Sequence, residues 1–109
     1  MAARFIALFS QPENPEAFDG HYREVHAPIV RRYPKLRELR LTKADGVAGR
    51  TSPYYLVAEM GFDTRADLDA ALASEAGVES GRDLRNFAGA GVTMLIADDA
   101  APLGVPTDG

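Results

Sequence analysis

The clearest structural signal in the sequence comes from the segment of residues 54–62, which reads Tyr-Tyr-Leu-Val-Ala-Glu-Met-Gly-Phe. Every second residue in it is apolar, and these residues are Tyr54, Leu56, Ala58, Met60 and Phe62. The residues between them include Tyr55, Val57 and Glu59. Because successive side chains of a β-strand point to opposite faces of its sheet, this alternation predicts a strand with one face on the hydrophobic core.

Three further segments predict strands, and they lie on both sides of residues 54–62. Residues 4–10 and 91–98 are short and largely apolar, as is typical of strands that are buried on both faces. Residues 36–43 alternate between apolar and polar side chains, which also predicts a strand. Residues 44–53 contain the Asp-Gly and Ser-Pro pairs that mark a hairpin loop between two of these strands.

Two helical regions separate the strands. Asn14-Pro15-Glu16 suits the start of a helix, and apolar residues then recur every three or four positions, at Phe18, Tyr22, Val25, Ile29 and Tyr33. Asp63-Thr64 predicts the start of a second helix, which continues through residues 74–87 as a broken or short helix around Gly77 and Gly81. The resulting β-α-β-β-α-β order indicates an α+β, ferredoxin-like fold, with a four-stranded antiparallel sheet and both helices on one face.

Length and composition limit the class of protein. The chain has 109 residues, the size of one domain, and we expect residues 1–98 to form that domain and residues 99–109 to form a C-terminal tail. Twelve Lys and Arg against sixteen Asp and Glu give a net charge of −4, which disfavours nucleic acid or an anionic membrane as the partner.

The absence of certain sequence features is also informative. No apolar run has the length of a membrane span, and the N-terminus does not follow the pattern of a signal peptide, so we expect a cytoplasmic protein. The sequence contains no cysteine, which excludes disulfides, thiolate metal sites and a cysteine nucleophile.

The two strands predicted to be apolar on both faces create a packing problem. Both helices cover the same face of a ferredoxin-like sheet, so the other face would expose a large apolar patch in a single subunit. We therefore expect a homodimer in which two subunits pack sheet against sheet.

Two residues that disfavour an α-helix, Gly20 and Pro28, flank the candidate acid–base residues Tyr22 and His26. Tyr22 and His26 are four residues apart and so lie near the same helix face. At about 100° per residue, His26 lies roughly 60° from the middle of the apolar stripe, where we expect one ring nitrogen to stay near solvent. Histidine ionises near neutral pH, which makes His26 the stronger candidate.

Structural explanations stay open for the same residues. A histidine beside a tyrosine can serve packing alone, Pro28 can bend or end the helix, and Gly20 can let the helix approach the sheet closely. His21 and His26 diverge by about 140° on an α-helix, and no third ligand is nearby, so we expect no metal site.

Glu59 and Tyr55 are weaker candidates. Glu59 is either a solvated residue on the outer face or a buried carboxylate that pairs with Arg40 or with a ligand. Tyr54 and Tyr55 offer one ring to each face of the sheet, for core packing, dimer packing or the lining of a pocket. The sequence holds no phosphate-binding loop, dinucleotide fingerprint or nucleophile-elbow motif, so we expect no bound cofactor.

Residues 21–28, His-Tyr-Arg-Glu-Val-His-Ala-Pro, follow a predicted strand and the run Asn14-Pro15-Glu16-Ala17-Phe18. Together with residues 52–60 and 87–95, they closely resemble the signature of EthD-type proteins. The resemblance extends from residue 4 to about residue 98. Those proteins belong to the dimeric α/β-barrel superfamily, whose ferredoxin-like subunits join sheet to sheet.

The resemblance implies a role with a small organic compound. EthD itself is tied to the degradation of ethyl tert-butyl ether, beside a haem monooxygenase system. Relatives in the superfamily act on aromatic polyketides, lactones and similar ring compounds, as cofactor-free monooxygenases, cyclases, isomerases or dehydratases. In the resemblance, His26 corresponds to the family's recurrent histidine, with Tyr22 beside it and Pro28 after it.

We therefore predict one small, mostly apolar pocket per subunit, in which His26 and Tyr22 are catalytic and Tyr55, Glu59 and His21 bind the substrate. The expected ligand is a small hydrophobic or aromatic compound, enolisable or phenolic, that undergoes acid–base chemistry without metal or cofactor. Two alternatives stay open: a non-catalytic accessory protein that delivers such a compound to an oxygenase, and a structural dimer whose histidine is a satisfied core residue.

Overall fold

Four strands pair antiparallel in the order β2-β3-β1-β4 in the computed structural model, which describes residues 2–106. The strands are β1 (Ala3–Ser10), β2 (Glu38–Lys43), β3 (Tyr54–Phe62) and β4 (Val92–Asp98). The helical segments are α1 (Pro15–His21), the π-helical turn η1 (Tyr22–His26), α2 (Ala27–Val30), the short 3-10 turn η2 (Val47–Gly49), α3 (Arg65–Ala73) and α4 (Glu75–Phe87). The predicted α+β, ferredoxin-like fold is confirmed.

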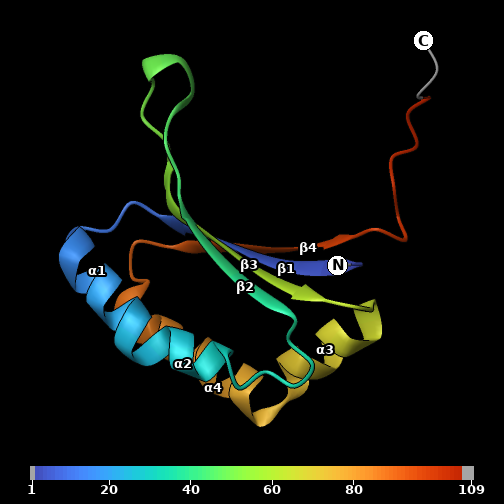
Figure 1. Cartoon of the computed structure of the whole chain (residues 1–109). Helices are drawn as coiled ribbons and strands as arrows, with labels where there is room; N and C mark the ends of the chain where they lie inside the picture. Colours follow the sequence, from blue (N-terminus) through green and yellow to red (C-terminus); the bar gives the residue numbers. More distant parts are fainter. Residues whose placement is uncertain (1, 107–109) are drawn as a thin grey trace.

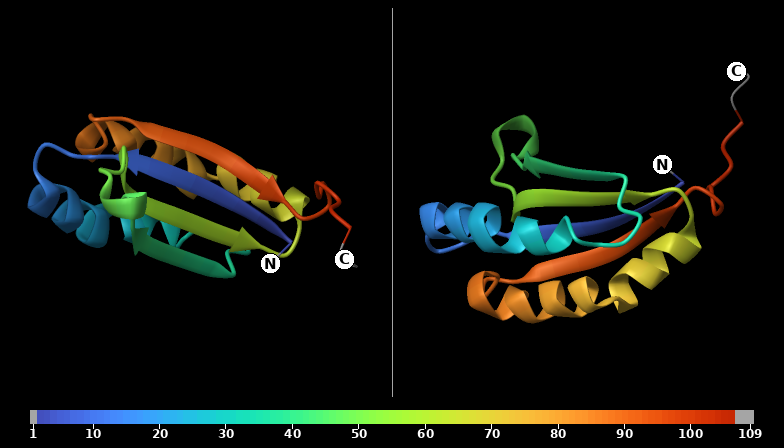
Figure 2. Two further views of the ribbon diagram at one scale, coloured as in Figure 1. Left: turned by 90° about the horizontal axis from the view of Figure 1, so that it is seen from above. Right: turned by 60° about the horizontal axis from the view of Figure 1, so that its bottom comes forward.

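The α-helices lie together on one side of the sheet (Figure 1). From above, the strands lie over the helices and the other face of the sheet is uncovered (Figure 2). None of the helices within residues 2–106 has the length and hydropathy needed to cross a membrane. Residues 99–106 form neither helix nor strand, and residues 107–109 of the predicted tail lie outside the described part of the chain.

Side-chain caps begin the helices where the sequence predicts them. The Asn14 side chain accepts a hydrogen bond from the Ala17 N–H at 3.1 Å, and Thr64 caps α3 in the same way. Ser74 ends α3 and caps α4, so the break lies at Ser74 and not at Gly77 or Gly81, through which α4 runs uninterrupted. Gly77 is required there, because an added Cβ would lie 2.4 Å from the carbonyl oxygens of Ala71 and Leu72.

The first helical region continues through Pro28 because its preceding turn is widened. The Ala27 N–H donates to the Tyr22 carbonyl, five residues back, so the backbone makes one π-helical turn over Tyr22–His26. Pro28 has no N–H to donate, and the helix nevertheless runs on to Val30. Gly20 has open space where a Cβ would be, so the explanation that it allows a close approach to the sheet is wrong.

The widened turn also changes which side chain faces the core. Residue i+4 comes closer to residue i in a π turn than in an α turn, so His26 aligns with Tyr22. His26 is only 5% exposed, whereas Val25 is 42% exposed. The prediction of Val25 on the buried stripe is therefore wrong, and so is the prediction of His26 at the boundary with solvent.

A β-bulge changes the predicted orientation of Tyr55. Phe9 pairs with Leu56 and Ser10 with Tyr54, so Tyr55 is an extra residue in β3. Its ring packs edge-on against Phe18 of α1, at a centroid distance of 5.4 Å. Tyr55 therefore lies on the helix side of the sheet, and the prediction that it shares a face with Glu59 is wrong.

The opposite face of the sheet has apolar side chains that no other part of residues 2–106 covers with a layer. In the register of the strands, Ile6 lies between Glu59 on β3 and Leu95 on β4, and Leu8 lies beside Val57. Leu95 is 42% exposed, and Ile6, Leu8 and Val57 are half-buried. This is the face that the predicted dimer would cover.

Candidate active site

A single buried carboxylate, that of Asp83 in α4, connects the two histidines of the chain. His26 Nδ1 lies 2.9 Å from Asp83 Oδ2, and His21 Nε2 lies 2.9 and 3.0 Å from the two Asp83 oxygens. The Asn86 side-chain amide donates to Asp83 Oδ1 at 2.9 Å. One acidic group therefore accepts hydrogen bonds from three side chains, two of which come from the first helical region.

The π-helical turn explains how His21 and His26 reach the same partner. In a π turn, residues five apart are hydrogen-bonded neighbours along the helix, so the divergence expected for an α-helix does not apply. Within residues 2–106, no group of three or more His, Cys, Asp or Glu side chains is placed to hold a metal ion. The two imidazoles are instead partners of Asp83.

The hydrogen bonds determine the charge state of this cluster. Burial acts to raise the pKa of Asp83, but hydrogen bonds from Asn86, His21 and His26 outweigh it and hold the pKa below its ordinary value. Burial lowers the pKa of His26, against the opposing effect of Asp83. His26 is therefore neutral near pH 7, with its proton on Nδ1 facing Asp83 and the lone pair on Nε2.

His26 also lines an inner pocket of about 400 Å³ between the helices and the sheet. The other lining residues are Phe5, Ala7, Phe9, Tyr22, Tyr33, Met60, Leu72, Gly77, Ser80, Gly81, Leu84 and Met94. His26, Tyr22 and Tyr33 are among its buried members, whereas Gly81 and Met94 are exposed. The pocket therefore opens between α4 and β4 and has its polar groups at the buried end.

The Tyr22 hydroxyl is the unusual polar group in this pocket. It is buried and has no hydrogen-bond partner within residues 2–106. The Tyr22 ring lies against His26 at a centroid distance of 5.0 Å. Burial raises the pKa of Tyr22, so the phenol stays protonated and its O–H is available as a donor.

Tyr33 lines the same pocket but its hydroxyl is satisfied. It donates to Ser80 Oγ, and Ser80 in turn donates to the Gly77 carbonyl at 2.9 Å. Buried hydroxyls normally have such partners. Within residues 2–106, the fold therefore supplies a partner for one tyrosine hydroxyl of the pocket and leaves the other without one.

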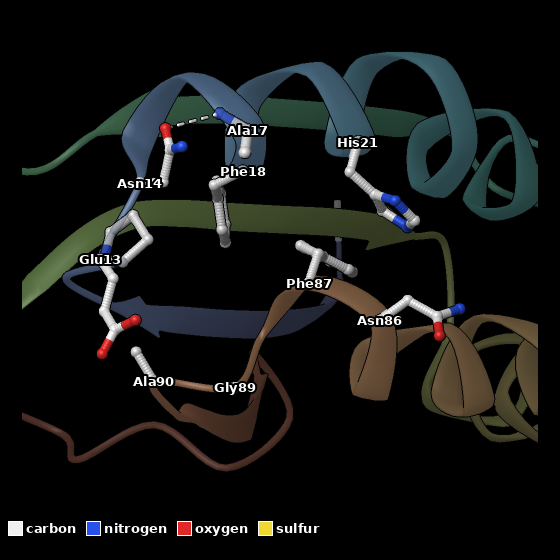
Figure 3. Close-up of a pocket in the computed structure, with 10 residues that line it drawn as sticks. Glu13, Asn14, Ala17, Phe18, His21, Asn86, Phe87, Gly89 and Ala90 are labelled. Atoms are coloured by element: carbon white, nitrogen blue, oxygen red, sulfur yellow. Dashed lines mark hydrogen bonds between the residues drawn. The ribbon is translucent and has the colours of Figure 1, made fainter.

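A second, outer cleft has a volume of about 620 Å³, and His21 is one of the residues that line it. Figure 3 shows His21 extending from α1 toward Asn86 and Phe87 of α4, with Glu13 and Ala90 farther along the cleft. The Phe87 ring stacks on His21 at 4.9 Å and lies 4.8 Å from His26. Phe87 therefore contacts both imidazoles, and His21 belongs to the outer cleft rather than to the inner pocket.

The remaining predicted site residues lie elsewhere. The Tyr55 hydroxyl donates to Asp19 Oδ1 at 2.9 Å. The Lys43 ammonium donates to both the Asp19 carboxylate and the Tyr55 hydroxyl. Glu59 lies on the uncovered face opposite Arg40, which pairs with Glu38 instead. That His21, Tyr55 and Glu59 bind substrate stays a prediction, and none of the three lines the inner pocket.

Asp83 is the residue that sequence reasoning missed. It lies three positions after Ser80 and four before Phe87, so it occupies the buried side of α4. An acidic residue on the apolar stripe of a helix is a signal that it has a buried partner. The spacing alone does not identify that partner.

Known proteins are similar to this chain over most of its length. The EthD domain family matches residues 10–91. An uncharacterised 11.0 kDa protein from the thcB–thcC intergenic region of Rhodococcus erythropolis is 34% identical over 100 residues, which cover 92% of this chain and 97% of that protein. The crystal structure of an EthD family protein from Bacillus halodurans is 39% identical, with a TM-score of 0.83, and the match covers 90% of this chain and 98% of that one.

More distant structures share the fold alone. A hydroxynitrile lyase from Passiflora edulis is 14% identical with a TM-score of 0.72, over 95% of this chain and 96% of that one. Other solved structures with this fold are dimeric ferredoxin-like proteins of unknown function.

Proposed function

This chain belongs to the EthD domain family, and we propose that it binds a small, neutral, hydrophobic or aromatic compound in the inner pocket and moves a proton on it. The observation that carries the proposal is the buried, unpartnered Tyr22 hydroxyl beside His26 in an otherwise apolar pocket. A buried hydroxyl without a partner costs about 1–3 kcal/mol. A ligand oxygen that accepts its hydrogen bond would remove that cost.

In this proposal His26 is the general base and Asp83 is a positioning residue. Asp83 accepts the Nδ1–H bond, which fixes the tautomer and leaves the Nε2 lone pair to take a proton. The substrate C–H or O–H bond breaks, and its proton forms the Nε2–H bond of His26. The electron pair moves onto the substrate oxygen, which accepts the Tyr22 hydrogen bond.

The lining of the pocket restricts the substrate class. Among residues 2–106, His26 is the one side chain in the lining that can carry positive charge, and it is held neutral; no Lys or Arg of this part of the chain lines the pocket. A carboxylate or phosphate ligand would therefore enter without a counter-ion, which is costly in an apolar site. The pocket suits an enolisable ketone, ester or lactone, or a phenol.

Several reaction types begin from the anion that this step would form. Return of the proton to a different carbon isomerises the substrate, and loss of a neighbouring leaving group makes the reaction a lyase or dehydratase reaction. With dioxygen as co-substrate, the same anion is the starting point for a cofactor-free oxygenation. The second candidate function is a non-catalytic accessory protein that delivers the compound to an oxygenase, which the largely apolar lining favours.

We also propose that two copies pack through their uncovered sheet faces. Ile6, Leu8, Val57 and Leu95 form the apolar part of that face. An apolar sheet face normally needs a covering layer, and a two-fold axis lets the same face of a second copy supply it.

Exchange of substrate protons with D₂O tests the catalytic proposal before the natural substrate is known. A panel of neutral aryl ketones, β-diketones and lactones is first screened for binding, and deuterium uptake at the carbon next to the carbonyl is then followed by NMR. We expect the protein to accelerate exchange for a compound that binds, and His26→Gln to reduce the rate by about 10²-fold or more. Tyr22→Phe also slows exchange.

Tyr33→Phe is the matched control, because it removes a hydroxyl from the same pocket that already has a protein partner. Its exchange rate should stay near that of the wild type. Equal exchange by wild type and His26→Gln would contradict the role of His26. Tight binding without any acceleration would support the accessory function, and failure of the whole panel to bind would overturn the substrate class.

A further inference from the structure

We propose that His21, which solvent reaches through the outer cleft, takes up the first proton that the His21–Asp83–His26 cluster binds, so that the buried His26 stays neutral and able to act as a base. His21 is then a positioning residue that acts on His26 through the carboxylate they share. The biological meaning of this inference rests on the proposed function, because it concerns the base strength of the same His26.

The shared carboxylate makes the two histidines compete for one negative charge. His21 Nε2 approaches both Asp83 oxygens, at 2.9 and 3.0 Å, whereas His26 Nδ1 approaches one, at 2.9 Å. A bond between an imidazolium and a carboxylate is stronger than one between neutral partners. Asp83 can therefore stabilise a proton on either ring. Which ring receives the proton depends on the solvent exposure of each ring and on the other charges near it.

The surroundings favour His21. Its side chain is 24% exposed, whereas the His26 side chain is 6% exposed. A positive charge on His21 keeps part of its hydration, and a positive charge on His26 would lose nearly all of it. Once His21 is charged, repulsion between the two rings further disfavours a proton on His26.

Other charges near the two rings do not reverse this order. Asp83 and Asn86 reach the cluster from α4, and Tyr22 and Tyr33 reach the inner pocket from the first helical region. The pocket lining contributed by α3 and by β1, β3 and β4 is apolar. At the outer cleft, the further charged side chain in the lining among residues 2–106 is Glu13, which is acidic.

The two rings can be observed separately, because the chain contains two histidines and no more. In ¹⁵N-labelled protein, imidazole nitrogen signals report the charge and tautomer of each ring as pH is lowered, and His21→Gln assigns them. We expect His21 to protonate first, while His26 keeps its Nδ1–H tautomer to lower pH. The titration needs no substrate, so its failure is distinct from failure of the exchange assay.

His21→Gln also tests the coupling. The glutamine amide can still donate to Asp83 but cannot take a proton, so the pKa of His26 should rise, by about one pH unit or more. The acidic limb of the exchange rate against pH should move upward by the same amount. Arg31→Gln, which removes an exposed charge that lines neither cavity, is the control and should leave both titrations unchanged.

Two results would overturn the inference. One is a wild-type titration in which His26 takes the first proton. The other is an unchanged His26 titration in His21→Gln, which would mean that His21 supports packing and does not set the charge state of its neighbour.

Discussion

At the scale of single residues, the pocket contains two tyrosines that differ in one hydrogen bond. The Tyr33 hydroxyl has a partner in Ser80, and the Tyr22 hydroxyl has none within residues 2–106. Both rings are buried. Packing therefore accounts for both aromatic rings but does not account for the hydroxyl of Tyr22.

This difference predicts opposite effects of the same substitution on stability. Without ligand, Tyr22→Phe removes an unsatisfied polar group and should leave the free energy of unfolding unchanged or raise it. Tyr33→Phe removes a satisfied hydrogen bond and should lower the free energy of unfolding by about 1 kcal/mol. Urea unfolding of the two variants beside wild type measures both values.

A Tyr22→Phe variant less stable than Tyr33→Phe would contradict this prediction. It would mean that the Tyr22 hydroxyl has a partner in the folded protein and needs no ligand oxygen to accept its hydrogen bond.

At the scale of elements, the π-helical turn and α4 together build the site. The turn brings His26 inward and places His21 and His26 on one partner, and α4 supplies that partner. α4 also lines the mouth of the inner pocket with Gly81, where a side chain would occupy space that the backbone leaves open. Glycine in a helix interior costs about 1 kcal/mol relative to alanine, so this opening has an energetic cost.

Gly81→Leu should therefore narrow the pocket without harming the fold. Gly20→Leu is a matched control, because Gly20 is also helical, also has no atom within 4 Å of an added Cβ, and does not line the inner pocket. We expect both variants to be at least as stable as wild type, and only Gly81→Leu to weaken binding of the larger ketones of the panel. Calorimetric titration measures the binding, and equal weakening by both variants would place the entrance elsewhere.

At the scale of the whole molecule, the sheet has helices on one face and partly exposed apolar side chains on the other (Figure 2). The largest fully buried side chains of the described residues are Phe9 and Phe62 of the sheet and Leu68 and Val30 of the helices. The uncovered face carries the apolar side chains of Ile6, Leu8, Val57 and Leu95, and the proposed dimer would bury them.

Leu95→Glu should convert the dimer into a monomer, because burying an unpaired carboxylate between two sheets is strongly unfavourable. Val78→Glu is the control: Val78 is 45% exposed, close to the 42% of Leu95, but lies on α4 on the helix side. Sedimentation equilibrium of the three proteins measures their mass. A monomeric wild type, or an unchanged mass for Leu95→Glu, would contradict packing through this face.

The sequence predicts the elements well because their signals are local. Alternation in residues 54–62 and the Asn14 and Thr64 caps each depend on residues a few positions apart, and the structure contains all of them. The order of these elements was enough for the ferredoxin-like fold. The sequence also identified His26 and Tyr22 as a pair, because they are four positions apart.

Contacts between residues far apart in the sequence depend on the tertiary packing, which the local patterns do not contain. The bulge at Tyr55 arises from the register between two strands, and the inward turn of His26 from one wide helical turn, so periodicity placed both incorrectly. Asp83 and His26 are 57 positions apart, and their contact depends on how α4 packs against the first helical region. A periodic pattern records which face of an element is buried, whereas the partner of a buried polar group is determined by the packing of whole elements against each other.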